Sequence, residues 1–250
     1  MTDPLAAYAL ALGDDALVSS QQLGWWISRA PQIEEDVALA NIGLDQLGQA
    51  RTLLAYAGAV EAAGRDEDDL AYFRDAAGFR NVCLVERAQT DFAVTMVRLL
   101  LFATWQHELY ADLAAGRDTT LAGVAGKAVR ETAYHVEHAR HWVLRLGDGT
   151  EQSHRRAQAA LDDEWAWRGE LFDASWLDPR LVESGVALDP AALRPRVEGA
   201  VTTVLRQATL AVPTGPEQRS RGRHGLHTEE MGPLLAEMQS VARAHEGVTW

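Results

Sequence analysis

The sequence of 250 residues contains one cysteine, Cys83, which excludes an internal disulfide and a zinc site built from cysteines. A catalytic thiol is not supported either. Residues 80–85 resemble the start of an amphipathic helix, where a lone cysteine serves as a small apolar side chain. The scarcity of cysteine is compatible with a reducing cytoplasm.

Long apolar runs are also missing. The longest candidate, residues 96–104, is interrupted by Arg98 and is too short to span a membrane. The first residues, Met1 to Pro4, lack the basic start and the apolar core of a signal peptide. These two features predict a cytoplasmic protein.

Basic residues are outnumbered, with 23 Lys and Arg against 36 Asp and Glu, a formal net charge of -13. Nucleic acids and anionic membranes require a basic surface, so neither is expected as a partner. The sequence also lacks a G-x-S-x-G elbow, a glycine-rich phosphate loop and a His-Glu-x-x-His motif. Their absence argues against the commonest hydrolase, nucleotide-binding and metalloprotease functions.

Runs of β-branched residues are few, whereas Ala, Leu, Glu, Arg and Gln dominate the periodic segments, and this predicts an all-α fold in a single domain, residues 1–250. The hydrophobic content of 47% supports a large core. Four long helices that form a bundle are predicted at residues 31–62, 81–115, 118–146 and 150–172. Shorter helices are predicted at 5–12, 14–29, 191–209 and from a cap at Thr228, with a surface loop at 213–225.

The first long helix carries an apolar stripe that is predicted to face the core. Gly43 and Gly48 lie within the same helix and each costs on the order of 1 kcal/mol relative to Ala, which predicts a close approach of another helix. The stripe consists of Val37, Ala40, Leu44, Leu47, Arg51 and Leu54.

Two helical segments each carry half of a metal-binding motif. Proteins that hold two irons in a four-helix bundle take a Glu-x-x-His pair from each of two helices and one Glu from each of the others. In residues 45–48, Asp45 is able to coordinate but Gly48 has no side chain, and in residues 132–135, His135 remains while Thr132 replaces the carboxylate. A frame one residue earlier keeps Glu131 but puts a tyrosine in place of the histidine, so neither frame completes the pair.

The histidine-rich run at residues 131–141 leaves two interpretations open. Glu131, His135 and His138 share one helix face, and with Asp45, His107 and Glu108 from other helices they would form a remodelled mono- or dinuclear site. Alternatively, His107, His138 and His141 are solvated or half-buried helix residues that bind nothing.

Two further features suggest partners or ligands. Arg219, Arg221 and Arg223 concentrate positive charge before the last helix, which suits a phosphate or an acidic partner surface, or else a solvated loop. The sequence also contains eight tryptophans, more than one core accommodates comfortably, so some are candidates for partner contacts: Trp25, Trp26, Trp165, Trp167 and Trp176.

Several longer blocks of the sequence are distinctive: residues 12–15 (LGDD), 36–51 (DVALANIGLDQLGQAR), 170–173 (ELFD), 225–229 (GLHTE), 234–239 (LLAEMQ) and Trp250. Together they resemble the structural C subunits, PaaC type, of the phenylacetyl-CoA oxygenases (epoxidases) of bacterial phenylacetate degradation. The resemblance runs the whole length.

The resemblance implies a ferritin-like four-helix bundle with additional N- and C-terminal helices, shared with a catalytic A subunit that carries two Glu-x-x-His pairs and a di-iron centre. Those pairs fall at residues 45–48 and 132–135 here, and the remaining carboxylates would fall near Gln21 and Ala103, neither of which is acidic. Asp45 and His135 are then vestigial positions. No catalytic residue, metal or cofactor is expected in this chain.

The implied function is that of a non-catalytic structural subunit, which stabilises the catalytic subunit of an oxygenase that epoxidises the ring of phenylacetyl-CoA. The implied partners are the di-iron A subunit, a small bridging subunit and a reductase. Two alternatives stay open. One is a metal-dependent oxidoreductase built around Asp45, Glu131 and His135, and the other is a binding module in which the arginines at 219, 221 and 223 meet CoA phosphates or an acidic partner.

Overall fold

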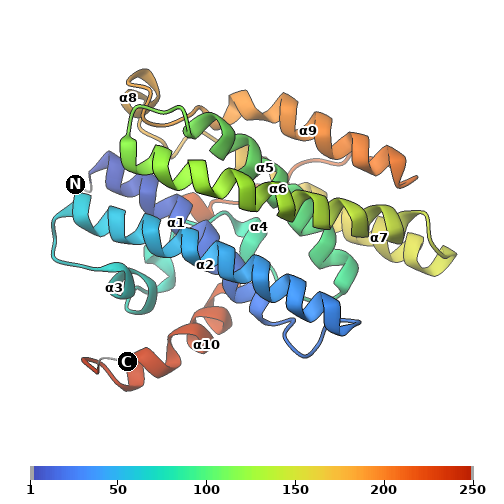
Figure 1. Cartoon of the computed structure of the whole chain (residues 1–250), viewed down its shortest axis with the longest axis horizontal. Coiled ribbons are helices and arrows are strands. Elements are labelled where there is room, and N and C mark those ends of the chain that lie inside the picture. Colours follow the sequence, from blue (N-terminus) through green and yellow to red (C-terminus); the bar gives the residue numbers. More distant parts are fainter. Residues whose placement is uncertain (1–2, 249–250) are drawn as a thin grey trace. The chain divides into compact units, whose positions relative to one another are not determined.

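Helices make up the regular structure of the computed structural model, which describes residues 3–248; Trp250 therefore lies outside the described residues. Within that part of the chain there are ten α-helices and three short 3-10 helices, and the only β-type pairing is an isolated bridge between Arg221 and Leu226 (Figure 1). The predicted all-α fold class is confirmed.

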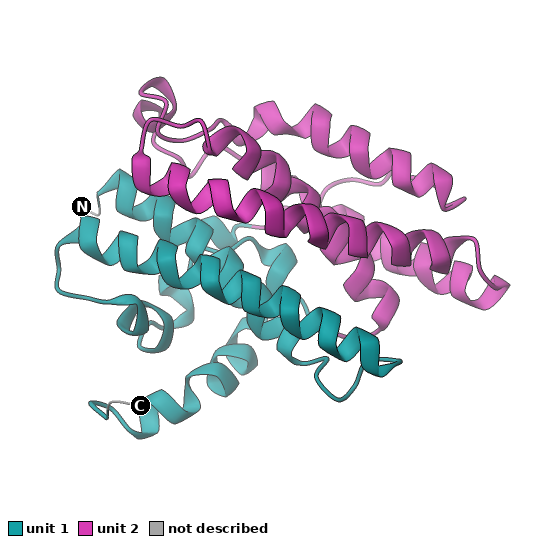
Figure 2. Cartoon of the chain, in the orientation of Figure 1, with its two compact units in different colours: residues 1–88, 221–250 teal, residues 89–220 magenta. Residues whose placement is uncertain are grey.

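The chain divides into two compact units (Figure 2). Unit 1 is discontinuous and combines Met1–Ala88 with Arg221–Trp250, whereas unit 2 is the continuous segment Gln89–Ser220. Each unit is built around one antiparallel pair of long helices (Figure 1). That all 250 residues form a single domain stays a prediction.

In unit 1 the long pair is α1 (Pro4–Gly24) and α2 (Ile33–Glu61). The carboxylate of Asp3 caps α1 by accepting from the backbone N–H of Leu5, and α2 ends where Ala62 adopts a left-handed conformation. The unit is completed by α3 (Glu67–Tyr72), α4 (Cys83–Glu86) and α10 (Met231–Ala244), and α10 packs against α3.

The predicted break between two opening helices at Gly13 is wrong, because α1 runs through this glycine without interruption. A Cβ at Gly13 would lie 2.9 Å from Cδ2 of Leu54 on α2, so the missing side chain lets the two helices approach closely. A Cβ at Gly43, where the sequence predicted the close approach, would make only an ordinary contact of 3.7 Å with Leu23.

The predicted core stripe of α2 is also wrong for most of its members. Val37, Leu44, Leu47 and Arg51 are exposed, whereas Leu54 is buried. The helix buries a different face, which carries Leu39, Ile42, Gly43, Gln46, Gln49, Ala50 and Leu53. The periodicity identified the helix correctly, but α2 has two apolar faces and the sequence pattern did not show which one packs against α1.

In unit 2 the long pair is α5 (Phe92–Leu113) and α6 (Thr119–Gly147), and both α7 (Glu151–Trp165) and α9 (Pro190–Gln207) pack against α5. The predicted cap at Asp118 is confirmed, because its carboxylate accepts from the backbone N–H of Thr120 and Leu121. A short helix, α8 (Pro179–Glu183), precedes α9.

Arg98 lies on the buried face of α5, and its guanidinium donates to both carboxylate oxygens of Glu164 on α7 at 2.9 Å. Such bidentate pairing compensates for the desolvation of both charges. The arginine that interrupts the most apolar run of the sequence is therefore an internal charge with a partner.

Four predicted helix boundaries differ from the structure. The helix predicted at residues 14–29 already ends at Gly24, the last residue of α1. The predicted helix 81–115 is divided into α4 and α5, because the chain is extended at Asp91, whose carboxylate caps α5. The predicted helix 150–172 ends at Trp165 and continues as a 3-10 helix, Ala166–Phe172. The last helix begins at Met231, and Thr228 does not cap it. Among residues 3–248, no helix combines the length and the apolar composition needed to cross a membrane.

Candidate functional site

The first incomplete metal motif lies in unit 1. Asp45 is half-buried on α2, and one turn further along the same helix Gly48 offers no ligand atom. Gln21, near the expected position of another carboxylate, is half-buried on α1 and carries a neutral amide. Unit 1 therefore presents one carboxylate where a di-iron protein of this class requires a carboxylate and an imidazole together.

The second incomplete motif lies on α6 in unit 2. Thr132 is fully buried, and its hydroxyl donates to the Ala128 carbonyl oxygen at 2.8 Å. The Nδ1 atom of His107 on α5 lies 3.3 Å from the same hydroxyl oxygen, so the imidazole is the donor in this contact. His135 is fully buried one turn beyond Thr132, and Ala103 is fully buried on α5. Thr132 thus occupies the position of the carboxylate ligand, and its hydroxyl is already hydrogen-bonded to the backbone of α6.

Two of the other candidate ligands of unit 2, Glu108 and Glu131, form ion pairs. Glu131 lies 3.0 Å from Lys127, and Glu108 lies 3.3 Å from Arg196. Among the described residues of unit 2, no three His, Cys, Asp or Glu side chains bring ligand atoms within metal-binding distance of one another. Because Gly48, Thr132, Gln21 and Ala103 supply no carboxylate or imidazole, the donor set does not fit a di-iron centre.

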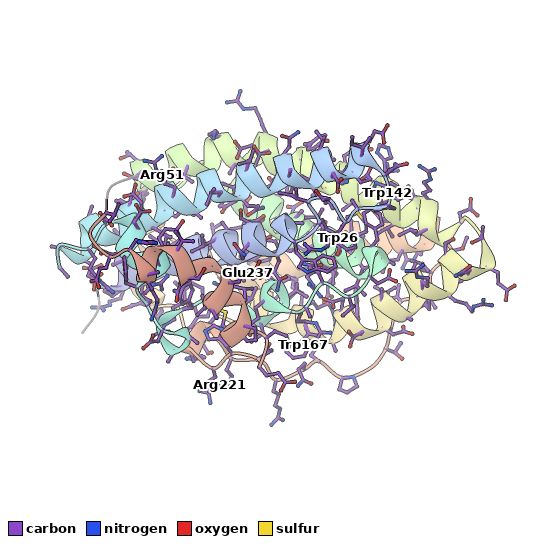
Figure 3. The ribbon with its side chains drawn as sticks, turned by 90° about the horizontal axis from the view of Figure 1, so that it is seen from below. Trp26, Arg51, Trp142, Trp167, Arg221 and Glu237 are labelled. Atoms are coloured by element: carbon purple, nitrogen blue, oxygen red, sulfur yellow. The ribbon has the colours of Figure 1, made fainter. Side chains whose placement is uncertain are left out.

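The three arginines before the last helix differ in environment. Arg219 and Arg221 are exposed, and Figure 3 shows the Arg221 side chain at the surface. Arg223 is only 3% exposed, and its guanidinium donates to the carboxylate of Asp15 at 2.6 Å and to the carbonyl oxygen of Ala11 at 3.0 Å. Arg223 is an internal counter-ion, so it is not available to a phosphate. Ligand binding by Arg219 and Arg221 stays a prediction.

Six buried charged residues form a set within unit 1 that we call the buried ionic cluster: Asp14, Asp15, Arg74, Glu86, Arg223 and His227. Asp14 accepts from Arg74 through both carboxylate oxygens, with one of the two bonds at 2.9 Å, and from the backbone N–H of Arg80 at 2.8 Å. Asp15 pairs with Arg223 and accepts from the backbone N–H of Val82 at 2.8 Å. The two acids of α1 thereby bind three separate segments of the chain.

Glu86 is the third buried acid of this cluster. Its carboxylate oxygens lie 2.7 Å from Nδ1 of His227, 2.7 Å from Nδ2 of Asn81 and 2.5 Å from the backbone nitrogen of Thr228. The other ring nitrogen of His227 lies 3.2 Å from the carbonyl oxygen of Phe79. Every polar atom of this pair therefore has a protein partner, as burial requires.

Cys83, Glu86 and His227 form the only group of three potential metal ligands within residues 3–248, with ligand atoms within 4.8 Å of one another. The Glu86 and His227 ligand atoms are already engaged in the hydrogen bonds of the cluster, and Sγ of Cys83 lies 3.6 Å from the carbonyl oxygen of Leu226. The group therefore fits a buried ion pair with a neighbouring thiol.

Burial shifts the acid–base equilibria of the cluster. Desolvation raises the pKa of Asp15 to about 6, although the Arg223 guanidinium and the Val82 N–H oppose this shift. Desolvation lowers the pKa of His227, but the hydrogen bond and the charge of Glu86, with smaller contributions from the Phe79 carbonyl and Asp14, outweigh it and raise the pKa overall. Protonated His227 is thus favoured by its partner.

The buried ionic cluster is not evident from local sequence patterns. One signal was present: Asp14 and Asp15 interrupt an otherwise apolar segment, residues 5–18, with two adjacent acids. Charges inside an apolar helix require buried partners. Their partners, however, lie as far as 208 residues away, and no local pattern connects Asp15 with Arg223.

The fold and the site together define an all-α, ferritin-like protein with two incomplete di-iron motifs. The chain belongs to the family described as phenylacetic acid catabolic protein (PaaA_PaaC), whose model matches residues 1–250. It is 46% identical over 246 residues to the C subunit of 1,2-phenylacetyl-CoA epoxidase from Escherichia coli (strain K12), and the match covers 98% of this chain and 99% of the relative. The resemblance found in the sequence is confirmed.

Proposed function

We propose that this chain is the non-catalytic structural subunit of a multicomponent oxygenase that epoxidises the ring of phenylacetyl-CoA, and that it stabilises the catalytic di-iron subunit. The main support is the full-length identity of 46% to a protein named as the C subunit of such an epoxidase. The metal ligands missing at Gly48 and Thr132 support the non-catalytic role, because a chain without them cannot supply two Glu-x-x-His pairs.

A structural subunit must hold its own shape firmly, and the buried charges fit that requirement. Within unit 1, Asp14–Arg74 joins α1 to the segment after α3, Asp15–Arg223 joins α1 to the last segment, and Glu86–His227 joins α4 to the last segment. An alternative packing that separated such a pair would leave a buried charge without its counter-ion. The free-energy cost of that charge disfavours the alternative packing. These pairs support a rigid frame in this unit.

The first test is to measure iron in the chain purified alone and in the chain co-expressed with the catalytic subunit of the same oxygenase system. The expected result is no stoichiometric iron and no oxygenase activity in the isolated chain, and activity in the co-expressed pair with its reductase. Activity of the isolated chain with reductase and O2 would contradict the proposal. Loss of solubility of the catalytic subunit in the absence of this chain is the second expected outcome.

The alternative, a metal-dependent oxidoreductase with a site around Asp45, Glu131 and His135, is not favoured. Glu131 is paired with Lys127 at 3.0 Å, and Thr132 gives α6 a hydroxyl in place of a carboxylate. The variant His135→Ala separates the two functions. Unchanged iron content in the folded variant agrees with the structural role, whereas loss of bound iron from a folded variant would support the alternative.

A further inference from the structure

One helix of unit 1 carries a large share of the exposed apolar surface. Eleven large apolar side chains are exposed among the described residues, and four of them lie on α2: Ile33, Val37, Leu44 and Leu47. Two more, Trp25 and Ile27, lie in the segment between α1 and α2. On α2 the exposed fractions are 73% for Ile33, 56% for Val37 and 64% for Leu44. Such a concentration of exposed apolar side chains on a folded protein indicates a contact surface.

The spacing of the exposed apolar residues on α2 indicates what shape of partner fits them. Ile33, Val37, Ala40, Leu44, Leu47 and Arg51 follow one another at alternating intervals of four and three residues, and we call this row the α2 seam. That interval is the heptad repeat by which one helix packs along another. The apolar part of the seam extends about 21 Å at the helical rise, which is too long for a small molecule and suits about four turns of a helix.

A shallow hollow of about 230 Å³ continues the α2 seam at its C-terminal end. Its walls are formed by Leu47, Arg51 and Leu54 of α2 and by Glu67, Asp68 and Tyr72 at α3. Nε of Arg51, which Figure 3 shows at the surface of this unit, lies 3.2 Å from Oε1 of Glu67, and Asp68 is a second acidic residue of the lining. A lining that combines apolar and acidic side chains suits a long side chain that ends in a positive charge.

The charges around the α2 seam identify the kind of chain that fits it. Residues 33–69 contain nine acidic residues and two basic ones, Arg51 and Arg65. Four of the acids are consecutive, residues 66–69, and both burial and the neighbouring carboxylates raise the pKa of Asp68. A second copy of this chain would bring an equally acidic face against this one, and such like-charge juxtaposition opposes association. A helix with basic flanks would relieve the repulsion.

We propose that the α2 seam is the docking surface for a helix of a different subunit, with apolar residues at heptad spacing and Lys or Arg along its flanks. This inference rests on the proposed function, which requires a partner chain. The seam contributes the apolar contact, and the carboxylates at residues 66–69 orient the partner and accelerate its association. The sequence pattern that predicted a core stripe thus describes a surface that becomes buried only in the complex.

The test uses the full-length chain co-expressed with the tagged catalytic subunit of the same oxygenase system. Val37→Glu and Leu44→Glu each place a carboxylate in the seam, and Leu226→Glu is the matched control, because Leu226 is in the same unit, has the same exposed fraction as Val37, 56%, and lies outside the seam. Wild type and the control should co-purify with the catalytic subunit. Each seam variant should bind on the order of 100-fold more weakly, as expected for charged groups buried at the centre of an interface.

Circular dichroism and thermal unfolding establish that the seam variants are folded. Co-purification of both folded variants at wild-type yield would overturn the seam as the docking surface while leaving the proposed function intact. Failure of the wild-type chain itself to co-purify would overturn the proposed function and the docking surface together.

The identity of the occupant is tested by the isolated chain and by salt. The chain alone should be a monomer in sedimentation experiments. A dimer that Val37→Glu dissociates would mean that a second copy occupies the seam, contrary to the proposal. Association with the catalytic subunit should weaken as salt is raised, and Asp68→Asn should reduce that salt dependence. Association that is indifferent to salt would remove the requirement for basic flanks.

Discussion

Nδ1 of His227 lies 2.7 Å from Oε2 of Glu86, although the two residues are 141 positions apart in the sequence. Both side chains are buried, with exposed fractions of 4% and 0%. The pair joins the segment that precedes α10 to α4, and the same glutamate accepts from the backbone nitrogen of Thr228. The attachment of the last segment to unit 1 therefore depends on a titratable group.

The stability of unit 1 should fall as the pH rises above neutrality. In the folded protein the pKa of His227 lies above its ordinary value of 6.5. The folded state therefore holds this proton more tightly than the unfolded state does. The resulting contribution to the free energy of unfolding is complete below pH 6.5 and is lost as the pH rises through the folded pKa. Urea unfolding between about pH 6 and about pH 9 measures this slope.

The variant His227→Gln should remove most of that slope, because glutamine does not titrate. His141→Gln makes the same change at an exposed position in unit 2, where the imidazole faces Glu137, and the slope of unit 1 should persist in it. If the His227→Gln variant kept the same slope as the wild type, another group would control the pH dependence.

Two neighbouring arginines should differ sharply in their importance for folding. Arg223→Met removes the partner of a fully buried carboxylate and should lower the free energy of unfolding by about 3–5 kcal/mol. Arg221→Met alters an exposed side chain two positions earlier and should change the free energy of unfolding by less than about 0.5 kcal/mol. Chemical denaturation of both variants measures the difference.

The double variant Arg223→Met with Asp15→Asn tests the cause of the effect. Because the asparagine carries no charge, it should recover part of the stability lost in Arg223→Met. Equal stability of the single and the double variant would mean that lost packing accounts for the destabilisation, and that the buried charge of Asp15 does not.

Alanine should have opposite effects at two helical glycines. At Gly58 on α2 a Cβ would lie 2.2 Å from the carbonyl oxygen of Arg65, so Gly58→Ala should destabilise the protein by about 1–3 kcal/mol. At Gly126 on α6 a Cβ meets nothing within 4 Å, so Gly126→Ala should stabilise it by about 0.5–1 kcal/mol through helix propensity. Melting temperatures of both variants distinguish these outcomes, and stabilisation at Gly58 would contradict the observed close approach.

The single thiol should report on the integrity of unit 1. Cys83 is 2% exposed, so a thiol reagent such as DTNB should react with the native chain only through opening of this unit. The reaction rate should rise with urea in parallel with unfolding, and Arg223→Met should accelerate it in the absence of urea. Immediate stoichiometric labelling of the native protein would show that the thiol is accessible.

Much of the secondary structure could be predicted from local chemistry. The helices at residues 31–62 and 118–146 were predicted within about two residues at each end, because the acidic first turn of α2, the Asp118 cap of α6 and helix-favouring residues act over short distances. The 3-10 segment after Trp165 and the extended residues before Phe92 were missed. These depend on packing and on a single capping carboxylate, which propensities do not resolve.

The orientation of α2 was the least predictable feature of the fold. Val37 and Leu39 are both apolar and two residues apart, so they point to different faces, and only the observed packing shows that Leu39 is buried. At the site, the missing ligands at Gly48 and Thr132 were evident from residue type alone. The pairing of Asp15 with Arg223 was not, because contacts between distant segments leave no periodic signal.

Unit 1 is assembled from both ends of the chain, and this fixes an order in time during synthesis. Asp14 can pair with Arg74 early, whereas Asp15 and Glu86 wait for Arg223 and His227, which leave the ribosome only after all of unit 2. Contacts between residues 208 positions apart form slowly, because the long loop must close before they contribute. Until then two buried acids lack their counter-ions. A nascent chain that ends before Arg223 should therefore bind poorly to any partner that recognises the completed unit 1.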